Sequence, residues 1–337
     1  MTRDSRCYLG ADIGGTKTHV LIADETGRAV GFGEAGPGNH EVVDYPGLEA
    51  ALLAATGQAL AMAGLAKEQI VGAGFGVAGY DWPAEREPTL RAIGALGLSA
   101  PVEAVNDTLL GLLAGSPEGW GVAVVSGTGC NCWGWDRTRQ HIGQVTGGGL
   151  YFGEGAGASE LTGRAMRALA YEWTGRGPAT QLTPVLIQQA GARDLPDLLE
   201  GVMHDRYHLN AAAAPLIFRV AAAGDAVALD LVRWAGAELG ELAKTVICQL
   251  GFEKLAFDVV QIGSMWEGSP LLTEGMRAAV LAVAPGARLV RLSAPPVVGA
   301  LVLGMEVAGC LPSLAVRAAL AQSASGSARG ARQAASK

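Results

Sequence analysis

Short hydrophobic runs that end in glycine mark the first 35 residues of the chain. Their pattern predicts strands at residues 8–12, 19–24 and 29–33. Only a glycine turn and the polar stretch 24–27 separate these strands, which leaves no room for a helix between them. The chain therefore begins as a β-meander and not as a βαβ unit.

Longer segments with helical spacing alternate with strands further along the chain. The pattern predicts helices at 48–63, 84–96, 108–113, 271–283 and 297–309, and strands at 70–77, 102–105, 257–262 and 288–291. The strand–glycine turn–strand arrangement returns at 121–135, and a mostly helical stretch follows at 158–250. This repetition predicts two α/β halves that face each other across a cleft.

Length and composition narrow the class of protein. The 337 residues fit two domains, and half of them are hydrophobic. The net charge is −7, and no long basic run precedes the C-terminal tail, which argues against nucleic acid as the main partner. No apolar leader opens the chain, and the apolar stretches 52–66 and 299–311 are short for a membrane span. We therefore expect a cytoplasmic protein with no membrane partner.

Five cysteines are present, and only Cys130 and Cys132 lie close together in the sequence. Two residues apart on a strand, they share a face and could both reach a metal ion. A zinc site needs about four ligands, however, so a buried reduced pair is the favoured interpretation.

The first candidate phosphate site follows the first strand. Gly14 and Gly15 allow a tight turn with exposed backbone N–H groups, Thr16 adds a hydroxyl and Lys17 a positive charge. Asp12, at the end of the strand, is placed to hold Mg²⁺ through water, because this ion keeps several waters. The motif is not a P-loop, since a strand follows it. An ordinary Gly-Gly turn is the alternative.

A second turn of the same chemistry lies at the start of the second half. Gly127, Thr128 and Gly129 separate two predicted strands. A single turn of this kind is common, but two turns that each open a half of the chain are not. Together they predict a clamp around the phosphates of a nucleoside triphosphate.

Asp107 lies where a predicted strand gives way to a helix. Its carboxylate could simply cap that helix. It could also act as the general base that deprotonates an attacking hydroxyl. A carboxylate with an ordinary pKa of about 3.9 is a weak base, so orienting the hydroxyl would be its larger role.

Residues 74–79 match G-x-G-x-x-G, the fingerprint of dinucleotide-binding folds. Trp82 and Pro83 follow where a helix should begin, and no acidic residue ends a strand about 20 residues later. We therefore interpret the glycines as strand ends beside the cleft, with Asp81 facing it.

Two further regions supply candidate ligands. Asn39 and Glu154 carry the amide and carboxylate groups that grip sugar hydroxyls, although Asn39 also suits a simple turn. Gly263, Ser264 and Trp266 end a strand before a helix and could form a wall for adenine or ribose. Any βα loop would show the same pattern.

Taken together, these motifs resemble the N-acetylglucosamine kinase and BadF-BadG-BcrA-BcrD group of the acetate and sugar kinase–Hsp70–actin superfamily, over residues 8–309. The resemblance implies an α/β fold of two ribonuclease-H-like (actin-like ATPase) domains. Each would hold a mixed five-stranded sheet flanked by helices, with ATP and Mg²⁺ in the cleft. It places the domains at 1–120, completed by a helix at about 306–321, and at 121–305. Residues 322–337, with no aromatic or β-branched residue, are predicted to be disordered.

The same resemblance implies a sugar site. Asn39, His40 and Asp107 match the group's sugar-binding residues, whereas Glu154 stands where an aspartate is expected and Gly148 where a tryptophan is expected. The full candidate set is Asn39, His40, Asp81, Asp107, Asn131, Gly148, Gly149 and Glu154.

The predicted function is an ATP-dependent amino-sugar or hexose kinase, similar to N-acetylglucosamine kinases, that phosphorylates a sugar hydroxyl, most often O6. Glucosamine or another hexose is an alternative acceptor, and relatives of this kind are often homodimers. An ATPase of the BadF/BcrA activator type is the alternative class. No pair of cysteines has the spacing that its iron–sulfur cluster would need. The presence of Asp12 and Asp107 weighs against a binding protein without turnover.

Overall fold

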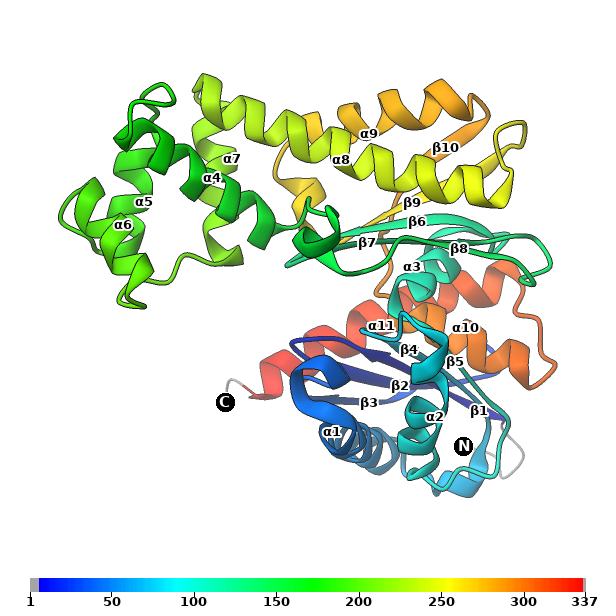
Figure 1. Ribbon diagram of the computed structural model, residues 1–337. Helices are drawn as coiled ribbons and strands as arrows, with labels where there is room; N and C mark the ends of the chain where they lie inside the picture. Colours follow the sequence, from blue (N-terminus) through cyan, green and yellow to red (C-terminus); the bar gives the residue numbers. More distant parts are fainter. Residues whose placement is uncertain (1–5, 336–337) are drawn as a thin grey trace. The chain divides into compact units, whose positions relative to one another are not determined.

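The computed structural model describes residues 6–335, and these residues form two compact units. The first contains the described parts of Met1–Gly121, Asp136–Arg139 and Val290–Lys337. The second contains Val122–Trp135 and Gln140–Leu289. The chain thus changes unit close to residue 121, where the sequence pattern restarts. Figure 1 shows the elements of each unit.

The first unit is built on a five-stranded sheet in the order β3-β2-β1-β4-β5. Its strands are β1 Cys7–Ile13, β2 Thr18–Asp24, β3 Ala29–Ala35, β4 Ile70–Val77 and β5 Val102–Asn106. The first three strands pair antiparallel, whereas β1, β4 and β5 run parallel (Figure 1). The expected β-meander is confirmed, and the parallel part brings three strand ends to one edge of the sheet.

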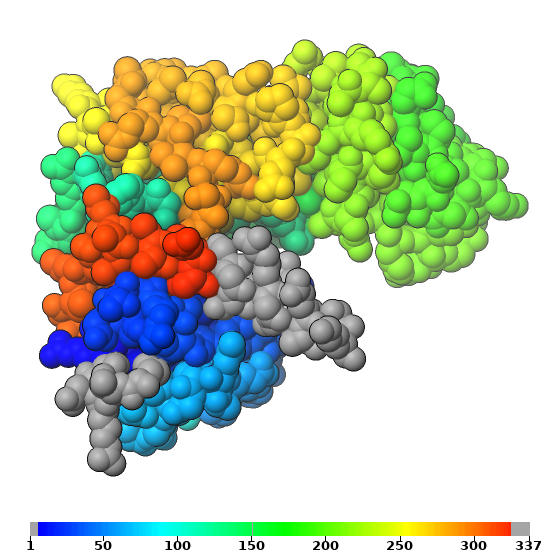
Figure 2. Space-filling model, turned by 180° about the vertical axis from the view of Figure 1, so that it is seen from behind, coloured from blue at the N-terminus to red at the C-terminus, as the bar shows by residue number. Residues whose placement is uncertain are grey.

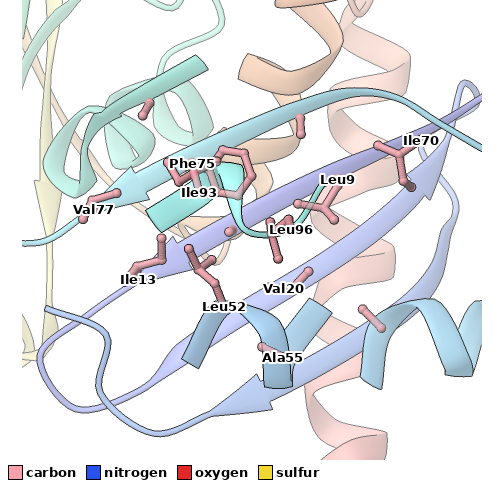
Figure 3. Close-up of a cluster of buried hydrophobic side chains, with 14 of the residues drawn as sticks. Leu9, Ile13, Val20, Leu52, Ala55, Ile70, Phe75, Val77, Ile93 and Leu96 are labelled. Atoms are coloured by element: carbon pink, nitrogen blue, oxygen red, sulfur yellow. The ribbon is translucent and has the colours of Figure 1, made fainter. Parts of the chain in front are cut away.

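Helix α1, His40–Ala63, covers one face of this sheet. Gly33 and Gly31 make the close approach possible, because a Cβ on either would overlap the carbonyl oxygens of Ala55 and Ala59. Helix α2, Arg86–Gly94, packs beside α1. Figure 3 shows the resulting core, whose labelled side chains are Leu9, Ile13, Val20, Leu52, Ala55, Ile70, Phe75, Val77, Ile93 and Leu96. Burying each large side chain contributes about 1.5–3 kcal/mol.

Helix α10, Val297–Val307, packs against β1, β4 and helix α3, Asp107–Gly115, in the first unit. A Cβ on Gly10 would lie 2.5 Å from the Leu301 backbone nitrogen, and one on Gly74 would overlap the Ala300 carbonyl oxygen. The sequence assigned residues up to 305 to the second domain. That boundary is corrected here, because glycines on two strands of the first sheet receive the backbone of α10.

The G-x-G-x-x-G glycines also have a different role from the one expected. Gly74 makes room for α10, and a Cβ on Gly76 would overlap the side chain of Leu110 in α3. These two glycines are therefore sites of helix packing and not glycines beside a cleft. Gly79 alone lies in the following loop, with a φ of 80°.

Helix α11, Leu314–Ala335, continues through most of the segment that was predicted to be disordered. Alanine and arginine are strong helix formers, so a polar segment can be helical without a hydrophobic core of its own. Helix α11 contacts β3, and Figure 2 shows its coloured first part, in red, against the N-terminal segment of the chain, in blue. The Ser323 hydroxyl donates to the Gly27 carbonyl oxygen at 2.9 Å. Residues 336–337 of the predicted tail lie outside the described residues.

The second unit holds another five-stranded sheet, in the order β10-β9-β6-β7-β8. Its strands are β6 Gly121–Ser126, β7 Cys130–Trp135, β8 Ile142–Gln144, β9 Phe257–Ile262 and β10 Ala287–Arg291. Strand β8 was not predicted, because its three residues show no hydrophobic alternation long enough to detect. Both sheets are mixed and flanked by helices, so the predicted fold class is confirmed.

Helices supply the rest of the second unit: α4 Ala158–Trp173, α5 Leu182–Ala190, α6 Leu195–Met203, α7 Ala214–Ala222, α8 Ala226–Leu250 and α9 Pro270–Val283. Helices α8 and α9 lie side by side in Figures 1 and 2. Within residues 6–335, no single helix is long and apolar enough to span a membrane, although Ala211–Ala222 and Ala226–Leu250, bent by 118°, pass that test as a pair.

Candidate active site

The carboxyl ends of β1, β4 and β5 meet at one edge of the first sheet, the usual place for a ligand in such a sheet. Backbone hydrogen bonds tie the loops at this edge together. The Gly14 carbonyl oxygen accepts from the N–H groups of Gly38 at 3.0 Å and Asn39 at 3.2 Å. Ala78 N–H donates to the Ile13 carbonyl oxygen at 2.9 Å. Candidate residues from three separate loops are thereby brought together.

The first glycine turn closes with a hydrogen bond of 2.9 Å from Gly14 N–H to the Lys17 carbonyl oxygen. Gly15, Thr16 and Lys17 are exposed. Among the described residues, no atom lies within 4 Å of the position that a Cβ on Gly15 would take. The turn therefore presents its middle residues to open space, as an anion-binding turn must.

Asn106, and not Asp107, caps helix α3. The Asn106 side-chain oxygen accepts from Thr108 N–H at 2.9 Å, and Asp107 is the first helical residue. The capping role that was the alternative explanation for Asp107 is thus filled by its neighbour. The Asp107 carboxylate at the head of α3 does not have to serve as that cap.

Three carboxylates gather at this edge of the sheet. Burial raises the pKa of Asp107 to about 7, with further contributions from the negative charges of Asp12 and Asp81. Burial also raises the pKa of Asp12 to about 6, and the positive charge of Lys17 opposes that rise. The expectation of an ordinary, weakly basic carboxylate at Asp107 is therefore corrected, because a pKa near 7 suits a general base at neutral pH.

Asp81 is almost fully buried, with 8% of its surface exposed. Asn106 holds it, because the Asn106 amide donates to Asp81 Oδ1 at 2.9 Å. The backbone N–H groups of Asp81 and Trp82 both donate to Glu85 Oε2 at 2.8 Å. Asn106 and Glu85 were missed from the sequence. Asn106 was visible there as a capping residue directly before the helix.

The Asn39–His40 pair lies at the start of α1. Asn39 Oδ1 accepts from Glu41 N–H at 2.8 Å and caps the helix, and a Cβ on Gly79 would come within 2.5 Å of the same oxygen. The His40 ring stacks on Tyr45 with centroids 4.6 Å apart, and its Nε2 lies 3.7 Å from Glu85 Oε1. Asn39 is therefore at the site, whereas His40 contacts residues that support it.

The second glycine turn is held from outside. The start of α4 donates to it, from Ala158 N–H to the Gly127 carbonyl oxygen at 2.8 Å and from Ser159 N–H to the Thr128 carbonyl oxygen at 2.9 Å. Gly263, with a φ of 100°, abuts the turn so closely that a Cβ would overlap the Ser126 carbonyl oxygen. Gly263 therefore packs directly against the backbone of the second turn.

Trp266 and Ser264 lie in the short helix Ser264–Glu267. The Trp266 indole is buried, and its Nε1–H donates to the Ile262 carbonyl oxygen at 2.9 Å. Of the three residues expected to form a nucleoside wall, Trp266 belongs to the core of the second unit, whereas Gly263 and Ser264 follow the end of strand β9.

Four of the predicted sugar residues lie in the second unit. Asn131 Oδ1 accepts from Cys132 N–H at 2.8 Å. Gly149 has a φ of 55°, and a Cβ on Gly148 would overlap the Phe152 ring. Glu154 is buried, and its Oε1 accepts from Thr146 N–H at 2.7 Å and from the Thr146 hydroxyl at 2.8 Å.

Magnesium is compatible with the carboxylates of the first unit. Within residues 6–335, no cluster of three or more His, Cys, Asp or Glu side chains could by itself hold a metal ion. Mg²⁺ is commonly held by one or two carboxylates together with water and substrate phosphates, so this observation fits the ion's chemistry. A cation would also relieve the unfavourable burial that raises the pKa of Asp12.

Solved structures share this fold. A protein from Chromobacterium violaceum that is provisionally described as an N-acetylglucosamine kinase has a TM-score of 0.66 at 21% identity. The match covers 88% of this chain and 98% of the Chromobacterium chain. A ROK family glucokinase from Streptomyces griseus, in complex with glucose and AMPPNP, has a TM-score of 0.50 at 19% identity. The match covers 94% of this chain and 99% of the glucokinase chain. The fold is therefore that of the actin-like ATPases and sugar kinases.

Sequence comparison then gives the family. The model of the BadF/BadG/BcrA/BcrD ATPase family matches residues 9–304, so the chain belongs to this family. The N-acetyl-D-glucosamine kinase of Dictyostelium discoideum is 25% identical over 314 residues, which cover 89% of this chain and 98% of that protein. The family that the motifs resembled is confirmed.

Proposed function

We propose that the protein is an ATP-dependent sugar kinase, similar to N-acetylglucosamine kinases, that phosphorylates a hydroxyl of an amino sugar or hexose, O6 in the first instance. The observation that carries the proposal is Asp107, a carboxylate at the head of α3 whose pKa is raised to about 7. The whole-length similarity to a named N-acetyl-D-glucosamine kinase supports the choice of acceptor.

In the proposed reaction, Asp107 accepts the proton of the sugar hydroxyl. The sugar oxygen forms a bond to the γ-phosphorus, the bond from that phosphorus to the β,γ-bridging oxygen breaks, and ADP leaves. Phosphoryl transfer needs little covalent help, so orienting the hydroxyl and stabilising charge would supply most of the rate. The rigid environment of Asp107, next to the buried Asp81–Asn106 pair, favours such orientation.

The glycine turns are the proposed ligands of the ATP phosphates, through Gly14, Gly15, Thr16 and Lys17 and through Gly127, Thr128 and Gly129. Gly263 and Ser264 are proposed to face the nucleoside. Asp12 would hold Mg²⁺ through water, and the ion would neutralise phosphate charge when bound. Asn39, Asp81, Asn131, Gly148, Gly149 and Glu154 are the proposed sugar contacts, and His40 supports them through Glu85.

The first test is ADP release from ATP with N-acetylglucosamine, glucosamine, N-acetylmannosamine, glucose or no sugar. We expect turnover that depends on one of the sugars. ADP release at the same rate without sugar would instead favour the alternative class, an ATPase of the BadF/BcrA activator type, since the family is described as one of ATPases. No turnover with any of the sugars would refute the kinase proposal.

The second test is Asp107→Asn. We expect kcat to fall by about 10²–10⁴-fold, the usual contribution of a general base, with ATP affinity almost unchanged. Asp24→Asn is the matched control in the same unit, because Asp24 is buried but bonded to Thr26 and Arg28. Near-normal turnover of the Asp107 variant would contradict its assignment. A homodimer in the cytoplasm is part of the proposal, and size-exclusion chromatography with light scattering tests the dimer.

A further inference from the structure

Thr146 makes two hydrogen bonds to one oxygen of the Glu154 carboxylate. Its backbone N–H donates to Glu154 Oε1 at 2.7 Å, and its hydroxyl donates to the same oxygen at 2.8 Å. The other oxygen, Oε2, is buried and has no hydrogen-bond partner among the described residues. A buried acceptor without a donor loses its hydration and gains no hydrogen bond, so this arrangement is unfavourable unless a ligand supplies the donor.

Glu172 also accepts on one oxygen, from Thr180 N–H at 3.3 Å and the Thr183 hydroxyl at 2.5 Å, but that residue is only partly buried. Two other carboxylates that bond to threonine, Asp225 and Asp24, do not share the asymmetry. Asp225, the cap of α8, accepts from the Thr180 hydroxyl and Ala228 N–H on Oδ1, and from Gln181 N–H on Oδ2. In Asp24, Thr26 bonds to one oxygen and Arg28 bonds to the other. In these structural examples both oxygens are satisfied. Glu154, with 8% of its surface exposed, is buried about as deeply as Asp24, at 6%, but only one of its oxygens has hydrogen-bond donors.

The loop around Glu154 is built to hold this geometry. Glu154 N–H donates to the Gly149 carbonyl oxygen at 2.8 Å, and Gly148 N–H donates to the Thr146 hydroxyl at 3.2 Å. The loop also depends on glycines with positive φ, 74° at Gly147 and 85° at Gly153. Hydrogen bonds across both ends of the loop therefore fix the carboxylate before any ligand arrives.

We propose that Thr146 is a positioning residue that occupies Glu154 Oε1 and leaves Oε2 as a single acceptor for one hydroxyl of the sugar. This inference rests on the proposed kinase function. A carboxylate with two unoccupied oxygens can take two neighbouring hydroxyls at once. With one oxygen occupied, the site selects acceptors that present one hydrogen-bond donor here, whatever the group on the adjacent carbon.

Thr146→Val tests the positioning role. It removes the hydroxyl bond and keeps the backbone one, so we expect the KM for the sugar to rise roughly three- to tenfold, while kcat and the KM for ATP stay nearly constant. Thr146→Ser keeps the hydroxyl and should restore the sugar KM. Thr180→Val is the matched control, because it removes a threonine–carboxylate bond from the same unit without touching the loop. An unchanged sugar KM in folded Thr146→Val would refute the role.

Monodeoxy analogues of glucose and N-acetylglucosamine test the single acceptor. Glu154→Gln and the removal of one sugar hydroxyl should each raise the KM for the sugar. The two effects on KM should be non-additive for the hydroxyl at one ring position and additive for the hydroxyls at neighbouring positions. Non-additive effects at two adjacent ring positions would show that both carboxylate oxygens accept from the sugar, and they would overturn the inference. The Glu154→Gln series also carries the test should Thr146→Val not fold. Wild-type protein that phosphorylates none of the parent sugars would refute the kinase function itself, whereas the outcomes above leave that function intact.

Discussion

The two glycine turns have similar sequences but different surroundings. The middle of each turn is open: Gly15, Thr16 and Lys17 are exposed in the first and Thr128 and Gly129 in the second, and a Cβ on Gly15, Gly127 or Gly129 would meet nothing within 4 Å among the described residues. The second turn is packed from outside, by the start of α4 and by Gly263. Neighbouring backbone therefore holds both turns, and the neighbours differ: the loop at Gly38 and Asn39 bonds to the first turn, whereas α4 and Gly263 pack against the second.

Their electrostatic surroundings differ as well. Asp12 lies on the strand that leads into the first turn. Burial raises the pKa values of Asp12 and Asp107, and the negative charges of Asp12 and Asp81 add to the rise at Asp107. The second turn is followed by Cys130, whose pKa burial raises to about 12, so its thiol stays neutral. Two buried carboxylates with raised pKa values therefore lie at the first turn, whereas the residue that follows the second turn is a neutral thiol.

The largest expected effect on stability comes from Gly263→Ala. The added methyl would overlap the Ser126 carbonyl oxygen, and alanine is strained at a φ of 100°. We expect the free energy of unfolding to fall by about 2–4 kcal/mol and ATP affinity to fall with it. Chemical denaturation and ATP titration measure the two effects. Gly251→Ala is the control, since it shares a positive φ but has open space around its Cβ. Equal losses in both variants would show that contact with the second turn is unimportant.

The next effect concerns the pH dependence of stability. In the folded state the pKa of Asp107 is about 7, compared with an ordinary value of 3.8. Between these values the folded protein binds the extra proton, so this residue lowers stability as pH rises from about 4 to 7, with the full cost present above 7. We expect Asp107→Asn to be more stable than wild type at pH 8, and the difference to vanish near pH 4.

Thermal unfolding of both proteins from pH 4 to pH 8 checks this expectation. A parallel pH profile for wild type and variant would mean that the carboxylate titrates normally. The two turns would then no longer differ in their electrostatic surroundings, although the residues that pack against them would still differ.

Much of the fold followed from local patterns in the sequence. The meander of β1, β2 and β3 was predictable because each strand is a short apolar run between turn residues. The place of α10 was not, because it depends on Gly10 and Gly74 meeting a helix about 230–290 residues away in the chain. A glycine that receives a distant helix and a glycine that lines a ligand site look alike in a sequence.

The candidate site shows the same limit. Asp107 could be identified as a carboxylate at a strand end, but the sequence did not show that Asn106 takes over the capping. Its raised pKa also depends on Asp12 and Asp81, which come from other strands and loops. The half-satisfied Glu154 needs the position of Thr146 eight residues earlier. Such properties arise only when separate loops meet.

The smallest structural effect is expected from Gly15→Ala. The φ of Gly15 is not positive and its Cβ would point into open space, so alanine fits without strain. Alanine also restricts the unfolded chain, so stability should stay constant or rise by about 0.4–1 kcal/mol. The methyl would nevertheless stand where a phosphate must approach the backbone, and we expect the KM for ATP to rise several-fold. Gly57→Ala, on α1 with equally open surroundings, should gain stability and leave that KM unchanged. An unchanged KM in Gly15→Ala would reduce the first motif to an ordinary turn, and the second turn alone would then remain as a phosphate ligand.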